Sequence, residues 1–245
     1  NLYPAFSTFS NPNKKHVFVN SETGISEEIQ FDMLKPFGPR IGHVQCPDSI
    51  VDRLIELTDE LVNTEDYESS GKNLVGVISH EPTIPLETLE EIGILSFFNN
   101  ILNHYVLTVL KEQELMKEED SLAIGVKAMW YVHQQAGEYN PLHHHTFCNI
   151  SSVMYLDVPE MPKRNIPNKV ERDGNITLVN HASWPESLNN GVFEIKPQRG
   201  AMYLWPSHLL HTVYPFIGNE IRKSIAWNGD FQLSNSEGQI ILGTQ

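Results

Sequence analysis

The second half of the chain consists of short apolar runs separated by turn residues, and this pattern constrains the fold more than any other feature. The runs cover residues 122–133, 150–158, 176–179, 192–195, 201–205, 212–216 and 221–231. Between them stand turn-forming residues such as Pro159, Gly174, Gly200 and Pro206. Short strands at this spacing are typical of a β-sandwich or a β-barrel. We therefore expect a mainly β structure after residue 121.

Two segments of the first half have apolar residues at spacings of three and four, which predicts helices over residues 50–62 and 86–116. Ser49 with Asp52 three residues later resembles a capping box, which places the first helix start at that point. The helices would brace one face of a sheet. Nothing resembles a linker, so we expect one domain over residues 1–245, with N-terminal strands and supporting helices in 1–121, the catalytic core in 122–233 and a tail in 234–245.

Composition excludes several classes of function. The chain has 245 residues with 17 Lys and Arg against 31 Asp and Glu, a formal net charge of −14. This acidity argues against binding nucleic acid or a membrane surface through basic side chains. Two cysteines, Cys46 and Cys148, are no disulfide framework and indicate a reducing compartment. The longest apolar stretch is interrupted by Asn and His, and no signal segment opens the chain, so we expect a cytoplasmic protein.

Three consecutive histidines, His143 to His145, precede the strand that begins near Ile150. Side chains alternate in an extended segment, so His143 and His145 share one face while His144 points to the other. Two imidazoles on one face are half of a site for zinc, copper, iron or nickel. His211 is the better-placed third ligand and His208 the other candidate. The alternative is a polar loop that binds no metal.

Arg222 and Ser224 follow His211 and share a strand face. We expect a paired hairpin to return the chain, so that Arg222 lies at the bottom of a pocket whose mouth holds His211. A guanidinium there would bind a carboxylate through two hydrogen bonds, and the Ser224 hydroxyl would add another. A metal with open positions beside such an arginine suits a chelating keto acid.

An ordered set of residues now becomes recognisable. It comprises Gly137, Asn140, His143, His145, 151–156, Pro159, Gly200, 204–207, His211, Arg222, Ser224 and Asn228. The set resembles the 2-oxoglutarate- and Fe(II)-dependent oxygenases, in particular a prolyl hydroxylase-like branch common in marine bacteria and their phages. The resemblance covers residues 122–231 and, more loosely, 71–76 and the upstream helices. It implies a mainly β fold with flanking helices and a double-stranded β-helix core, the cupin-like jelly roll.

The resemblance also implies roles for individual residues. His143, His145 and His211 would hold Fe(II), and Arg222 would complete the catalytic set. His145 stands where the wider superfamily has Asp or Glu, so this site would be one unit more positive than the usual one. Arg222 and Ser224 would bind the distal carboxylate of 2-oxoglutarate. Tyr155 is a second candidate contact to that carboxylate, and Gln134 and Asn140 are further candidates near the cofactor.

The function implied is hydroxylation of a peptidyl or small-molecule substrate, with O₂ as co-substrate, 2-oxoglutarate converted to succinate and CO₂, and ascorbate as an assay additive. A homodimer is an open alternative to a monomer. Two other functions compete: a non-catalytic β-barrel that binds a metal such as zinc and a carboxylate, and a three-histidine cupin dioxygenase without a keto acid. The Arg222–Ser224 pair speaks against the cupin dioxygenase.

Several other tryptophan, serine, cysteine and aspartate residues are interpreted as structural and not as ligands. Trp205 and Trp227 are read as core residues, Ser207 as either an entrance or a turn residue, and Cys148, Asp157 and Asp173 as non-ligands. Strand register directs Cys148 away from the histidines. The long loop over residues 159–190, which contains Trp184 and Pro185, is the expected lid or substrate-contact segment.

Overall fold

The computed structural model describes residues 3–4, 16–19, 26–29, 31–34, 38–63, 67–180 and 191–243. Its helices are α1 (Asp48–Val62), the 3₁₀ helix η1 (Ser70–Asn73), α2 (Leu86–Glu91) and α3 (Leu95–Glu112). Its strands are β1 (Tyr3–Pro4), β2 (His16–Val19), β3 (Ser26–Ile29), β4 (Phe31–Leu34), β5 (Ile41–Gln45), β6 (Ser121–Gln135), β7 (Asn140–His143), β8 (Ile150–Asp157), β9 (Ile176–Val179), β10 (Val192–Ile195), β11 (Ala201–Pro206), β12 (Leu210–Val213), β13 (Ile221–Ser234) and β14 (Ile240–Gly243).

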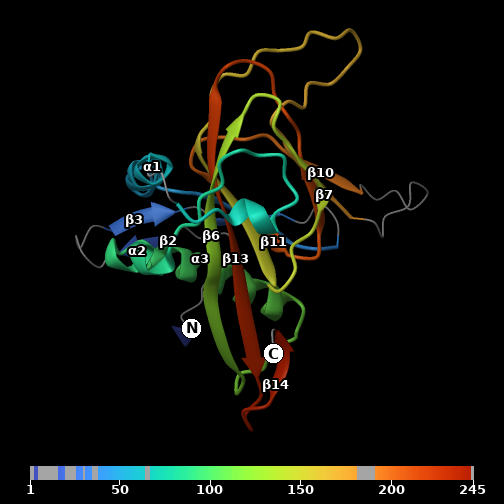
Figure 1. Ribbon diagram of the computed structural model, residues 1–245. Coiled ribbons are helices and arrows are strands. Elements are labelled where there is room, and N and C mark those ends of the chain that lie inside the picture. The colour runs from blue at the N-terminus through green and yellow to red at the C-terminus, as the bar shows by residue number, and fades with distance from the viewer. Residues whose placement is uncertain are drawn as a thin grey trace.

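Two antiparallel sheets form the core. The larger runs in the order β1-β6-β13-β8-β11-β5-β4, with β14 also paired to β13, and the smaller runs β10-β9-β12-β7. Figure 1 shows the long strands β6 and β13 at the centre, the smaller sheet on one side of them and helices α1 and α2 on the other. This arrangement is the double-stranded β-helix with flanking helices, so the fold class expected from the sequence is confirmed.

Alternation along the strands of the larger sheet supplies two separate cores. Trp227 on β13 faces the helices and meets Phe98 of α3 with ring centroids 5.7 Å apart. Trp205 on β11 faces the other way, into the space between the two sheets, where it packs with Leu178 and Tyr155. The helices therefore cover one face of the larger sheet, and the second sheet covers the other.

Helix α1 begins at Asp48, two residues earlier than expected, and the capping-box prediction is wrong. Pro47 is the N-cap and forms no side-chain capping bond, while Asp48 already lies in the first turn. Asp52 instead accepts a hydrogen bond from Arg199 Nη2, which anchors the turn before β11 to the helix. Proline suits this position because the first helical N–H groups have no intrahelical acceptor.

The helix predicted over residues 86–116 is two helices. Helix α2 ends at Glu91, and α3 begins at Leu95. Gly93 between them has a φ of +71°, a left-handed conformation that glycine adopts without steric cost. The apolar stripe continues across the break because Leu89, Ile94 and Phe98 all face the same core.

The chain also departs from the expected layout at three other places. Strands β4 and β5 precede residue 121 but extend the larger sheet through the pairing of β5 with β11. The segment expected to be a tail forms β14, which pairs with β13. The expected hairpin between His211 and Arg222 is wrong, because β12 belongs to the smaller sheet and β13 to the larger one. None of the helices in the described residues has the length and apolar character needed to cross a bilayer.

Candidate metal centre and its pocket

Three histidine side chains converge between the two sheets. His143 ends β7 and lies directly opposite His211 of β12, with ring centroids 4.1 Å apart. His145 follows in the loop, and its ring lies 5.4 Å from that of His143 and 5.1 Å from that of His211. One nitrogen from each ring can be chosen so that all three lie within 4.8 Å of one another. This is the arrangement of a three-ligand metal site with open positions.

Each imidazole is oriented by an acceptor on its Nδ1 side. His143 Nδ1 donates to the Pro141 carbonyl at 2.7 Å, and His211 Nδ1 donates to the Leu209 carbonyl at 3.0 Å. His145 Nδ1 donates to the side-chain oxygen of Asn228 at 2.7 Å. Carbonyl oxygens only accept, so the proton resides on Nδ1 and the lone pair of Nε2 is left for a metal.

Burial keeps these three imidazoles neutral. Desolvation lowers the pKa of His143, lowers that of His145 to about 4 and holds that of His211 well below its usual range. Neighbouring histidines lower the pKa values further, because a second positive charge in the cluster is unfavourable. Neutral imidazole is the form that binds a metal, so the pocket holds its ligands ready at neutral pH.

Asn228 gives a test of this orientation. We expect Asn228→Ala to weaken metal binding about 10- to 100-fold, the usual cost of losing the acceptor behind a ligating imidazole. The ring of His145 would then lose the one bond that fixes its tautomer and rotation. Titration with Zn(II) or Fe(II) measures the change. Asn100→Ala, on the exposed surface of α3, is the matched control, and equal affinities for the two variants would contradict this role of Asn228.

A buried arginine lies in the wall of the same pocket. Arg222 is 2% exposed and Ser224 1% exposed, and both line the pocket with the three histidines. Arg222 Nη1 donates to the Gly174 carbonyl at 2.5 Å, whereas Nε has no partner. Among residues 38–63, 67–180 and 191–243, no carboxylate pairs with this guanidinium, and desolvation lowers its pKa. A buried cation without a counter-charge is costly, so this arrangement suits an anionic ligand.

Tyr155, Asn140 and Gln134, the other residues predicted to lie near the cofactor, differ in whether they line the pocket. The Tyr155 ring lies under Arg222, with the guanidinium carbon 5.6 Å from its centroid, and burial raises the pKa of Tyr155 to about 12. Asn140 lines the pocket. Gln134 does not line it: this residue is opposite Arg222 on β6, and its Nε2 donates to the Glu138 carbonyl at 2.5 Å. The structure therefore brings Asn140 to the pocket and leaves Gln134 and Tyr155 beside it.

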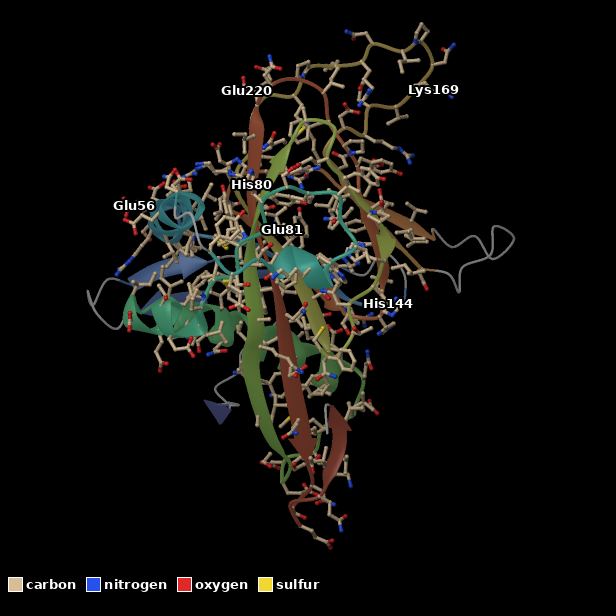
Figure 2. The ribbon with its side chains drawn as sticks, in the orientation of Figure 1. Glu56, His80, Glu81, His144, Lys169 and Glu220 are labelled. Atoms are coloured by element: carbon tan, nitrogen blue, oxygen red, sulfur yellow. The ribbon has the colours of Figure 1, made fainter. Side chains whose placement is uncertain are left out.

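The alternative ligands lie away from the centre. His144 and His208 are exposed, and Figure 2 shows His144 on the outside of the molecule. Neither residue belongs to the metal-binding group, nor does Cys148. Asp157 is exposed, and Asp173 pairs with Arg164 at 2.8 Å. His143 and His145 therefore point to the centre and His144 points away from it, as alternation along an extended segment predicts.

The structure tests the expectations for Trp205 and Ser207 but not the one for the lid. Trp205 is part of this wall and meets His211 edge to face at 5.1 Å, so its interpretation as a core residue alone is incomplete. Ser207 shapes the turn, because its Oγ donates to the Cys148 carbonyl at 2.6 Å and its own carbonyl accepts from His145 N–H. Trp184 and Pro185 of the expected lid lie outside the described residues.

Sequence reasoning missed two residues of the pocket, Glu81 and Trp130. Glu81 is 2% exposed, and burial together with the nearby Glu138 carboxylate raises its pKa to about 7. Trp130 on β6 lies against the His145 ring at 5.7 Å. A single Glu in an irregular segment carries no periodic signal, and Trp130 could have been found only by extending the alternation of β6 back from Gln134.

One protein-family model matches the part of the chain that contains the pocket residues. Residues 128–228 match the model of a family described as "Putative 2OG-Fe(II) oxygenase". The matched segment contains the three histidines, Arg222, Ser224 and Asn228. It supports the superfamily assignment that the sequence motifs indicate, and with the three-histidine group it identifies Fe(II) and 2-oxoglutarate as the cofactors. A search of curated protein sequences finds no match.

Several solved structures are similar over most of the chain. A prolyl hydroxylase of Trichoplax adhaerens in complex with a hypoxia-inducible-factor fragment has 14% identity and a TM-score of 0.48, covering 74% of this chain and 77% of its own. A prolyl-4-hydroxylase of Pseudomonas putida has 16% identity and a TM-score of 0.44, covering 75% and 88%. HygX of Streptomyces hygroscopicus, with nickel, 2-oxoglutarate and hygromycin B bound, has 10% identity and a TM-score of 0.47, covering 77% and 82%.

Proposed function

We propose that this chain is a 2-oxoglutarate- and Fe(II)-dependent dioxygenase that hydroxylates a peptidyl or small-molecule substrate. One observation carries the proposal: a three-histidine group and a buried, unpaired arginine line the same pocket. A simple metal-binding protein has no need for the arginine, and a simple anion-binding protein has no need for the histidines. A chelating keto acid uses both.

The roles of the residues follow from their positions. His143, His145 and His211 would hold the iron through Nε2, because Nδ1 of each ring is engaged elsewhere. When bound, Fe(II) with 2-oxoglutarate and O₂ supplies the oxidant for C–H hydroxylation and releases succinate and CO₂. Arg222 would bind the distal carboxylate through its planar fork, with Ser224 beside it on the same strand face.

The walls of the pocket would keep the reaction away from bulk water. Trp130 and Trp205 stand on either side of the histidines, and Val132 and Ile176 add apolar surface. An apolar lining strengthens the pairing of Arg222 with a carboxylate and protects reactive species from side reactions. The His-x-His pattern is also the feature on which we place the chain in the branch found in marine bacteria and phages.

A zinc-binding, non-catalytic protein is the second candidate, because the three ligands are neutral imidazoles and zinc binds such sets well. The two proposals differ in what the metal does with 2-oxoglutarate. Only chelation of 2-oxoglutarate by Fe(II) in this pocket would give a visible charge-transfer band.

The test is anaerobic addition of Fe(II) and 2-oxoglutarate to the protein. We expect a weak visible absorption band that requires both components, followed in air by 2-oxoglutarate loss and succinate formation with ascorbate present. The physical reason is that the three histidines leave open positions for both oxygens of the keto acid. The same titration with Zn(II) gives no band and serves as the control. If Fe(II) binds but no band forms, the 2-oxoglutarate-dependent proposal is wrong, and the non-catalytic protein and the three-histidine cupin dioxygenase are the remaining alternatives.

A further inference from the structure

Glu81 is a buried carboxyl group in the pocket that neither the metal nor the keto acid uses. It is 2% exposed and lines the same pocket as His143, His145, Arg222 and Ser224. Figure 2 shows it at the centre of the molecule, beside the turquoise helix η1. A polar side chain at such a depth normally has a partner.

The backbone around Glu81 pairs with β6 and thereby sets the direction of its side chain. His133 N–H donates to the His80 carbonyl at 3.1 Å, and Tyr131 N–H donates to the Pro82 carbonyl at 2.9 Å. The bridge between Thr83 and Trp130 fixes the register, which places Glu81 opposite Val132. Opposite residues of an antiparallel pair project from the same face.

The same row continues across the larger sheet. Val132 lies opposite Ser224 of β13, and Ser224 lies opposite Tyr155 of β8. Glu81 therefore shares a face of the sheet with Arg222 and Ser224, the residues proposed to bind the carboxylate of 2-oxoglutarate. One strand, β6, lies between them. With strands about 4.8 Å apart, the backbones of Glu81 and Ser224 are roughly 10 Å apart. The pocket has an acidic group at one side and a cationic group, Arg222, at the other.

No basic side chain among the described residues balances the charge of Glu81, since no Lys, Arg or His side chain there pairs with its carboxyl group. The neighbouring charged group is Glu138, whose own carboxylate is held by the Ser79 and Gln135 N–H groups at 2.9 and 2.8 Å. Burial and Glu138 both oppose ionisation of Glu81 and raise its pKa to about 7. A ligand cation would remove this penalty.

The surroundings of Glu81 suit the rest of such a ligand. Leu74 and Val75, which follow η1, add apolar side chains to the pocket lining. Trp130 also lines the pocket; its backbone pairs with Thr83, and its ring contacts that of His145. An indole face attracts ammonium and guanidinium groups, and methylene groups pack well on aliphatic side chains. These side chains would suit an aliphatic chain that ends in a positive charge.

We propose that Glu81 binds the substrate, and that it selects a substrate with an ammonium or guanidinium group on an aliphatic chain. The inference rests on the proposed oxygenase function, since it takes the space beside the metal centre as the substrate site. The cation lies against Glu81 and Trp130, and the chain leading from it passes toward the three histidines. Arg222 remains reserved for the carboxylate of 2-oxoglutarate.

The experiment compares cationic probes with neutral isosteres. N-acetyl-lysinamide is paired with N-acetyl-norleucinamide, and N-acetyl-argininamide with N-acetyl-citrullinamide. Binding is measured by anaerobic calorimetry on the protein, with and without Fe(II) and 2-oxoglutarate. We expect the parent protein to bind at least one cationic probe about tenfold more tightly than its isostere, as one charge-assisted contact would provide.

Two variants test whether the preference for cationic probes depends on Glu81. Glu81→Gln should reduce the difference between probe and isostere to about twofold or less, because it keeps the shape and removes the charge. Glu68→Gln is the matched control, since Glu68 is exposed and lies on the segment that pairs with residues 81–83. It should retain the full preference. If Glu81→Gln fails to fold, Glu81→Met replaces it in the same comparison.

The outcomes separate this inference from the proposed function. No cation preference in the parent, or a preference that survives in Glu81→Gln, would overturn the role of Glu81. Binding of 2-oxoglutarate, measured in the same samples, should be equal in the parent and in both variants. If the parent fails to bind 2-oxoglutarate while the cation preference depends on Glu81, the oxygenase proposal fails and the cation site stands.

Discussion

His211→Ala is expected to abolish metal retention, with a loss in metal affinity on the order of 100-fold or more. Removing only the hydrogen-bond acceptor behind a ligating histidine already lowers metal affinity about 10- to 100-fold, and this variant removes the ligand itself. His211 is 3% exposed and lies opposite His143 across a strand pair, so no other side chain can move into its place without breaking the pairing of β12 with β7. Two remaining imidazoles would hold a metal only weakly. Equilibrium dialysis against Zn(II) and Fe(II) gives the affinities.

The control for this experiment is close by in the sequence. His208→Ala removes an imidazole three residues earlier, from an exposed turn, and should leave metal affinity nearly unchanged. His144→Ala should behave in the same way, because its side chain points away from His143 and His145. A large loss in His208→Ala or His144→Ala would contradict the assignment of the three ligands.

Arg222→Lys should raise the half-saturating concentration of 2-oxoglutarate about 10- to 100-fold while leaving iron binding unchanged. Lysine keeps the charge but loses the planar fork, and a charge-assisted bond contributes about 1.5–3 kcal/mol. Arg222→Ala should be worse, because it removes the only unpaired buried cation that the described part of the pocket offers. Titration of the charge-transfer band with 2-oxoglutarate measures the change.

Arg199→Lys is the matched control for the arginine. Arg199 lies at the surface, where it bonds the Leu156 carbonyl and Asp52, far from the pocket lining. Its replacement should leave the affinity for 2-oxoglutarate unaltered. If Arg222→Ala binds 2-oxoglutarate as tightly as the parent protein, the dioxygenase proposal loses its main support, and the buried guanidinium has a purely structural function through Gly174.

The alternation of side chains along extended segments made part of the pocket predictable from the sequence. His143 and His145 share a face, as do Arg222 and Ser224, because an extended chain turns its side chains by half a rotation per residue. The same rule could not tell Trp205 from Trp227. Both stand on strands of one sheet, yet Trp205 faces the metal centre and Trp227 faces Phe98 of α3. Periodicity predicts which residues share a face of a strand. It does not predict whether helices or a second sheet cover that face.

The sequence predicted the positions of the helices better than the residues at which they begin and end. The apolar stripes of α1 and α3 follow from residue spacing, whereas the start of α1 at Asp48 depends on Pro47 and on the pairing of Asp52 with Arg199. Arg199 is distant in sequence and reaches Asp52 only because α1 packs beside the turn before β11. The break at Gly93 has a local cause, the left-handed backbone at that glycine, but a broad apolar stripe on both sides concealed it.

The sequence by itself determined the β-rich class of the core, the pairing of histidines on one face and the identity of the buried arginine, because these depend on residues close together in the chain. Only the tertiary structure decided how they meet. The chain crosses from the smaller sheet at His211 to the larger sheet at Arg222, and an irregular segment pairs with β6 to bring Glu81 into the same pocket. Such placements depend on strand order and long-range hydrogen bonds, which carry no periodic signal in the sequence.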